Sequence, residues 1–328
     1  MSLHSAYGIQ QFSESNCFLC GSSADITAEH VFPKWLQRSY DLWNQRLRLL
    51  NGTSIPYKSL CIPCCKKCNS EYLSGIEKSV SNVVARGYEE AVRLETRTWY
   101  LWAGKIFYGI LRKELSLPAD RSNPSKGAIA TNSLLKHFSN LHLFIQGVRG
   151  KHHFGGEVPY TVLVCNLHGA SSHFDFRDDL FQFSMSIRMG EVGVIVTFED
   201  GGLTQETYGK YVAEVGGRKL HPIQFTELYA KVCYQNSLRE NSLSYLTVSD
   251  EEGKGRATTT IANASTMIRE WNQEEFAELL QFHLGENVTV DFQPPDLVST
   301  WMVEPDGSIM IRSLDEWNGT RRDEGYDE

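Results

Sequence analysis

The sequence lacks the long apolar runs of a membrane protein and the start of a secreted one. Its longer apolar stretches, such as residues 192–198, fall far short of the roughly 20 residues that a membrane-spanning helix needs. The first thirty residues contain no basic stretch followed by an apolar one, the pattern of a secretory signal peptide. We therefore expect a cytoplasmic protein that does not bind membranes.

Positive charge is scarce over most of the chain. The 328 residues carry a net charge of −8, although 41% hydrophobic and 22% charged residues are ordinary proportions for a globular protein. Residues 1–80 hold eight Lys and Arg against six Asp and Glu, a balance of +2, which leaves −10 for the rest. This distribution excludes a protein that coats nucleic acid indiscriminately, so a nucleic-acid site is expected only in the first 80 residues.

Cysteine is nearly absent outside one short stretch, since only Cys165 and Cys233 lie elsewhere. The other six lie within 52 residues, at positions 17, 20, 61, 64, 65 and 68. Without an export signal, thiols in Cys-x-x-Cys spacing more often bind zinc than form disulfides, because the cytosol keeps thiols reduced. The sequence therefore predicts a structural zinc ion.

Two Cys-x-x-Cys pairs can supply the four sulfur ligands of tetrahedral zinc. The first pair is unambiguous, but the second is either Cys61 with Cys64 or Cys65 with Cys68. We favour the later pair because a helical pattern begins directly after Cys68, and we keep the earlier pair as the alternative. The predicted zinc ligands are Cys17, Cys20, Cys65 and Cys68.

Hydrophobic periodicity and turn residues predict an α+β fold. Helices are expected over residues 34–50, 68–84, 88–117, 129–146 and 223–239, and from Asn272 to Gly285. Strands are expected over residues 158–167, 288–293 and 299–312, with a hairpin over 181–200 and a loop over 118–127. We divide the chain into an N-terminal module (1–87), a larger mixed α+β domain (88–314) and an acidic tail (315–328).

The N-terminal motifs occur in a distinctive order: Cys-x-x-Cys, then Glu29-His30 on an extended segment, then Cys-x-x-Cys-Asn at the start of a helix. This order resembles the HNH endonuclease family over about residues 15–80. The resemblance implies a ββα-metal, treble-clef-like core that the zinc braces, with the acid and histidine on the first strand. The matching residues are Cys17, Cys20, Glu29, His30, Pro33, Cys65, Cys68 and Asn69.

The same residues suit metal-assisted hydrolysis of a phosphodiester bond. The Glu29 carboxylate and the Asn69 side-chain oxygen are hard ligands, appropriate for a catalytic Mg²⁺ or Mn²⁺. His30, with an unperturbed pKa of about 6.5, can take a proton from the attacking water. An ideal strand points Glu29 and His30 to opposite faces, so the strand has to twist or bulge if both serve one site.

Two features depart from the family pattern or leave alternatives open. Glu29 stands where the family more often has Asp, and Asn51, in a turn, is the nearest candidate for the family's middle asparagine. Glu77 follows Asn69 by eight residues and so lies near the same helix face. It is either an extra acid in the site or a solvated helix residue.

Cations alternate with aromatic residues around the proposed site. Lys and Arg side chains there can contact phosphates without reading sequence. The predicted nucleic-acid contacts are Lys34, Arg38, Lys66 and Lys67. Arg46 and Arg48 lie in the same stretch, and the interleaved tryptophans, Trp35 and Trp43, are expected to pack in the core.

The resemblance implies an HNH-type endonuclease that cuts nucleic acid; we favour DNA as the substrate and keep RNA as the alternative. By analogy, it also suggests an effector of bacterial restriction or antiviral (anti-phage) defence. The domain over residues 88–314 would then sense, recruit or select substrate, through a partner protein or a second copy of the chain. The alternative is a non-catalytic, zinc-bound treble clef that binds nucleic acid or protein.

Overall fold

The computed structural model describes residues 15–129, 137–155, 157–240, 243–249, 255–260, 268–286, 288–290, 292–293, 297–298 and 300–317. The fold is α+β, as predicted, with helices and several small sheets. It forms two compact units: unit 1 is Met1–Ala85, Leu94–Tyr160 and Leu243–Ala262, and unit 2 is Arg86–Arg93, Thr161–Ser242 and Asn263–Glu328. Residues 94–160, assigned above to the second domain, thus lie in unit 1, and residues 318–328 of the predicted tail lie outside the described residues.

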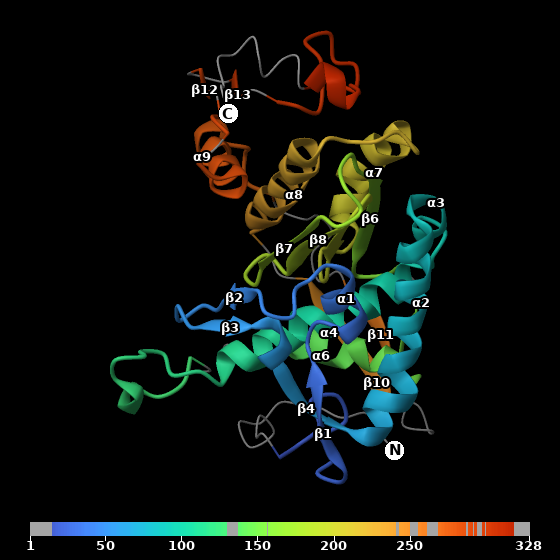
Figure 1. Ribbon diagram of the computed structural model, residues 1–328, viewed down its shortest axis with the longest axis vertical. Coiled ribbons are helices and arrows are strands. Elements are labelled where there is room, and N and C mark those ends of the chain that lie inside the picture. The colour runs from blue at the N-terminus through green and yellow to red at the C-terminus, as the bar shows by residue number, and fades with distance from the viewer. Residues whose placement is uncertain are drawn as a thin grey trace. The chain divides into compact units, whose positions relative to one another are not determined.

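In unit 1, two strands that are distant in the sequence pair antiparallel, and a helix follows the second of them (Figure 1). Strand β1 (Ile26–His30) pairs with β4 (Cys61–Cys65), with Glu29 opposite Ile62. A π-helical turn (Cys68–Leu73) then leads into α2 (Ser74–Arg86), so the predicted helix over 68–84 is confirmed. This arrangement places the second cysteine pair where β4 ends and the helix begins.

The segment between β1 and β4 corrects one helix prediction. The helix expected over 34–50 ends early, because α1 covers only Lys34–Ser39 and a strand, β2 (Arg46–Arg48), follows. From Arg46 to Leu49 the exposed and more buried residues alternate, the period of a strand. The Asn-Gly turn, with Gly52 at φ 76°, closes a hairpin with β3 (Ser54–Pro56), and a short 3-10 turn (Tyr57–Ser59) leads to β4.

The long helix predicted over 88–117 is two helices. The short α3 (Tyr88–Ala91) belongs to unit 2, whereas α4 (Thr96–Leu115) belongs to unit 1. Side chains of α4 are buried on nearly every side, which is typical of a helix in the centre of a fold. Trp102 stacks on Trp35 with ring centroids 6.2 Å apart, so Trp35, although partly exposed, packs against the buried α4.

The rest of unit 1 surrounds α4 with short elements. Within the helix expected over 129–146, residues 130–136 lie outside the described residues, and a helix covers the end of that range. A three-stranded sheet has the order β10–β11–β5. The elements are a 3-10 turn (Pro124–Lys126) in the predicted loop, α6 (Ser139–Ile145), a 3-10 turn (Gln146–Arg149), β5 (His152–Phe154), β10 (Ser244–Ser249) and β11 (Gly255–Thr260).

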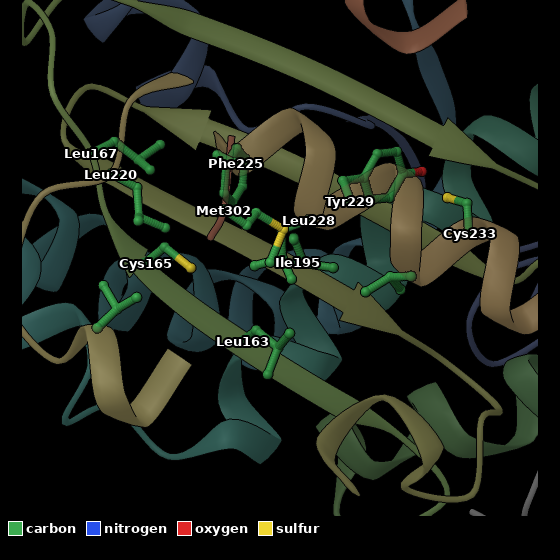
Figure 2. Close-up of a cluster of buried hydrophobic side chains, with 12 residues drawn as sticks. Leu163, Cys165, Leu167, Ile195, Leu220, Phe225, Leu228, Tyr229, Cys233 and Met302 are labelled. Atoms are coloured by element: carbon green, nitrogen blue, oxygen red, sulfur yellow. The ribbon is translucent and has the colours of Figure 1, made fainter. Parts of the chain in front are cut away.

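Unit 2 is an antiparallel sheet of order β6–β9–β8–β7, with helices packed on it. Its elements are β6 (Thr161–Asn166), β7 (Phe174–Asp179), β8 (Ser184–Met189), β9 (Val192–Thr197), α7 (Leu203–Val215), α8 (Pro222–Ser237), α9 (Gln273–Leu284), β12 (Phe292–Gln293) and β13 (Leu297–Val298). Side chains of α8, such as Phe225 and Tyr229, meet Leu163 and Ile195 of the sheet in a buried cluster (Figure 2).

Most elements predicted in unit 2 are confirmed. The strand over 158–167, the hairpin over 181–200, the helix over 223–239 and the helix from Asn272 all have counterparts. The Asn272 side chain accepts hydrogen bonds from the backbone N–H groups of Glu274 and Glu275, and Gly285 ends that helix. Of the strands expected over 288–293 and 299–312, the described residues retain β12 and a bridge between Val303 and Ile309. The partner of β12 is β13, which lies between the two predicted ranges.

The close approach of α4 to β1 gives a stability prediction. A Cβ at Gly109 would lie 3.0 Å from both methyl carbons of Val31. We therefore expect Gly109→Val to lower the free energy of unfolding by about 1–3 kcal/mol, the usual effect of overpacking. Thermal denaturation measures this change. As a matched control, Gly75→Ala in α2, where no atom lies within 4 Å, should have no effect or stabilise slightly; equal melting points for the two variants would contradict the prediction.

Candidate functional site

The predicted four-cysteine cluster is present. The thiol sulfurs of Cys17, Cys20, Cys65 and Cys68 all lie within 4.8 Å of one another. Cys20 Sγ and Cys65 Sγ are 3.6 Å apart, and the backbone N–H of Cys68 donates to Cys65 Sγ at 3.5 Å. Four sulfurs so close together could hold a metal ion such as zinc.

The cluster favours the charged form of one of its cysteines, Cys17. Hydrogen bonds from Cys20, Cys64 and Cys68 hold the pKa of the Cys17 thiol well below its ordinary value. The same hydrogen bond to Cys17 raises the pKa of Cys20 to about 11. Because the thiolate is the form that binds metal ions, the surroundings of Cys17 favour its ligating form, whereas hydrogen bonds to Cys17 raise the pKa values of Cys20 and Cys68.

The alternative pair, Cys61 and Cys64, lies outside the set of four. Cys64 is buried and its sulfur is 3.9 Å from that of Cys17. Cys61 lies opposite His30 at the other end of the strand pair, and its thiol donates to the Lys58 carbonyl at 3.7 Å. The geometry therefore favours Cys65 and Cys68 as the second pair.

Glu29 lies in a buried cluster of charges that the sequence did not reveal. Its carboxylate oxygen Oε1 is 2.6 Å from Nζ of Lys105, on α4. The same ammonium donates to Glu77 Oε1 at 3.0 Å, to the His30 carbonyl at 2.5 Å and to the Val31 carbonyl at 3.1 Å. The one sequence signal was a lysine inside the apolar run WYLWAGKIFYG, because a buried lysine needs anionic partners.

This cluster determines the environment of Glu77. Burial raises the pKa of the Glu77 carboxyl, although Lys105 opposes the change. Burial lowers the pKa of the Lys105 ammonium, but Glu77 and Glu29 more than offset this and hold it above its ordinary value. The Glu77 side chain is only 20% exposed, so it is not a solvated helix residue but a second acid beside Glu29.

His30 is the last residue of β1, and its imidazole is half-buried. The ring stacks on Trp43, with centroids 6.0 Å apart and planes 24° apart. Burial, together with the charges of Lys34 and Lys105, lowers the pKa of His30 below its ordinary value, and Glu77 opposes this. The imidazole is therefore neutral near pH 7, the form that can accept a proton.

Asn69 lies on the Glu29 side of the strand. Its side-chain nitrogen donates to Thr27 Oγ1 at 3.2 Å, and alternate residues of a strand, such as Thr27 and Glu29, share a face. Asn51, by contrast, is a turn residue. Its oxygen accepts from the Thr53 N–H at 3.0 Å, and its nitrogen donates to the Pro118 carbonyl at 3.1 Å.

The segment between His30 and Asn69 is strongly basic. Residues 31–68 hold seven Lys and Arg against one acid, Asp41. In the part of the chain that the structure describes, no ion pair includes any of these seven cations. The four predicted contacts are exposed: Lys34, Arg38, Lys66 and Lys67. Trp43, beside His30, is 36% exposed rather than packed in the core.

Three further observations bear on the interpretation. Among the described residues, the four cysteines are the only group of three or more His, Cys, Asp or Glu whose ligand atoms lie together. No described helix combines the length and apolar character needed to cross a membrane. Comparison with protein-family models, curated proteins and solved structures found no match.

The sulfur geometry gives a prediction for metal content. Cys17→Ser and Cys68→Ser each remove one of the four clustered sulfurs, so we expect both variants to lose zinc. Cys61→Ser and Cys64→Ser should keep one zinc ion per chain. Elemental analysis of the purified variants measures the stoichiometry, and loss of zinc from Cys61→Ser with retention in Cys68→Ser would reverse the assignment.

Proposed function

We propose that the chain is a zinc-braced, metal-dependent endonuclease of the HNH type, which hydrolyses phosphodiester bonds of nucleic acid, DNA rather than RNA. One observation carries the proposal. The Thr27–Glu29 face of β1 lies along the Asn69–Glu77 face of the following helix, while the four cysteines join the two at one end. A strand pair followed by a helix, with these residue types facing each other, is what the resemblance to ββα-metal nucleases requires.

The donor atoms at this face fit a hard divalent cation only in part. Glu29 Oε1 accepts from Lys105, and Asn69 donates its nitrogen to Thr27, which leaves one carboxylate oxygen and the amide oxygen as candidate ligands. Mg²⁺ commonly keeps several waters and takes one or two protein oxygens plus phosphate oxygens. Glu29 and Asn69 would hold such a Mg²⁺ or Mn²⁺ ion, which, when bound, supplies charge neutralisation at the phosphate.

His30 would act on the attacking water. Its neutral imidazole accepts a proton from the water, and the stack with Trp43 limits the directions in which the ring can point. The His30 carbonyl is bound by Lys105, which fixes the backbone on which the ring is carried. The chain's own contribution is therefore an oriented base within the electrostatic reach of Glu77 and Lys105.

The basic segment over residues 31–68 supports a polyanionic substrate. Seven cations without carboxylate partners among the described residues, in a chain of net charge −8, concentrate positive charge next to His30. Such cations contact phosphates without reading sequence. The predicted contacts Lys34, Arg38, Lys66 and Lys67 remain part of the proposal.

A second candidate function is a non-catalytic zinc-bound module that binds nucleic acid or protein. The ion pair between Glu29 and Lys105 favours it, because a carboxylate already bound by an ammonium has less capacity for a metal ion. Plasmid nicking in Mg²⁺ or Mn²⁺, compared with EDTA, separates the two candidates. If the chain is an enzyme, the domain over residues 88–314 would sense, recruit or select substrate through a partner protein or a second copy of the chain. The protein would then act in the cytoplasm as an effector of antiviral (anti-phage) defence.

The nuclease proposal predicts the effect of removing the base. We expect His30→Ala to lower the nicking rate by about 10² to 10⁴, the usual contribution of a general base. Zinc content and circular dichroism should stay unchanged, because His30 is half-buried and ligates no zinc. A nicking rate equal to that of the unaltered protein would remove His30 from the mechanism.

The basic segment predicts a salt-dependent interaction. Lys34→Gln with Arg38→Gln should lower the slope of log affinity against log salt by about 2, roughly one per lost phosphate contact. Anisotropy of a labelled DNA duplex in buffer without added Mg²⁺ or Mn²⁺ measures binding without cleavage and leaves the structural zinc in place. Lys210→Gln, at an exposed position on α7, is the control and should leave the slope unaltered. An unchanged slope in the double variant would place the phosphates elsewhere.

A further inference from the structure

Lys105 is the most deeply buried charge near the proposed site, and it comes from outside the cysteine-rich segment. The residue is 1% exposed, in the middle of α4. Its ammonium lies within 3.1 Å of four oxygens, two from carboxylates and two from backbone carbonyls. Three of these oxygens belong to the consecutive residues Glu29, His30 and Val31.

We infer that Lys105 is a positioning residue, which fixes residues 29–31 and thereby the imidazole of His30. The inference rests on the proposed function for the reaction that it serves. The side chain of Glu29 and the peptide groups on either side of the β1 terminus are bound to one nitrogen, so the last residues of the strand cannot rotate independently. A base has to be held close to its productive geometry, and small misplacements cost rate.

The competing explanation is that Lys105 only neutralises two buried carboxylates. The two explanations differ for a variant that keeps the charge balance but loses the bonds to the carbonyls. Lys105→Met with Glu77→Gln retains one negative charge in the cluster, as in the unaltered protein, and the new amide can donate to Glu29. If charge alone matters, this double variant behaves like the unaltered protein; if position matters, it does not.

The readout is the chemical reactivity of His30, which requires neither metal nor activity. Diethyl pyrocarbonate modifies neutral imidazoles, and mass spectrometry of peptides gives the rate at each histidine. His153, which is exposed, is the internal reference. We expect the His30 rate to change severalfold in Lys105→Met and in the double variant, at a temperature at which circular dichroism shows both folded, while the His153 rate stays constant.

A matched control tests whether loss of stability alone has this effect. Lys231 in unit 2 pairs at 2.8 Å with Glu227, whose side chain is fully buried. Lys231→Met also leaves a buried carboxylate without its cation, but it should alter neither the His30 rate nor plasmid nicking. If Lys105→Met alone does not fold, the double variant decides.

Nicking assays on the same proteins separate the failure of this inference from that of the proposed function. A double variant with unaltered His30 reactivity and an unaltered nicking rate overturns the inference and leaves the nuclease intact. If only His30 reactivity changes while nicking persists at the full rate, Lys105 does not serve the reaction and the inference is also overturned. If the unaltered protein does not nick, the nuclease proposal fails, and His30 reactivity alone decides whether Lys105 positions the segment.

Discussion

The arrangement of unit 1 depends on how one buried ammonium is satisfied. Moving a charged group from water into a protein interior costs roughly several kcal/mol unless polar atoms replace the lost hydration. Lys105 obtains them from Glu29 on β1, from the two carbonyls that follow it, and from Glu77 on α2. Strand, turn and helix are thereby bound to α4, with Trp102 on Trp35 and Gly109 against Val31 as apolar contacts beside it. The cysteine-rich segment therefore lies in the same compact unit as α4 and packs against it.

Local signals in the sequence were sufficient for the elements whose stability is local. The N-terminal cap at Asn272, the terminal Gly285 and the alternating apolar residues of the 181–200 hairpin each predicted their element, because the interactions involved lie within a few residues. The helix prediction for residues 34–50 failed because the structure of that segment depends on residues outside it. Its apolar residues fit a helix as well as a strand, and the outcome is set by pairing with Ser54–Pro56 across the Asn-Gly turn. The helix predicted over 88–117 is interrupted where the chain passes from unit 2 to unit 1, and hydrophobic periodicity gives no sign of such a boundary.

In the candidate site, too, features with a local sequence pattern were predictable, whereas contacts between distant residues were not. Cys-x-x-Cys pairs are recognisable in the sequence. It was therefore predictable that the two pairs would lie together, even though Cys20 and Cys65 are 45 residues apart. The partnership of Lys105 with the His30 carbonyl spans 75 residues and involves a backbone atom, which leaves no pattern in the sequence. A lysine in an otherwise apolar helix indicates only that buried anions exist, not which ones. The sequence left the role of Glu77 open for the same reason, because its partner, Lys105, lies 28 residues away.

Around His30, acidic groups predominate in the interior, whereas the exposed segment over residues 31–68 is basic. The two acidic side chains of Glu29 and Glu77 outnumber the single ammonium of Lys105 in the interior beside His30. The surrounding segment over residues 31–68 is basic by six charges. A polyanion attracted by this segment would meet repulsion at the acids unless a cation lay between phosphate and carboxylate. On the proposed function, the exposed cations bind the polyanion, and a divalent ion would offset the repulsion between the acids and the phosphate at the reaction centre.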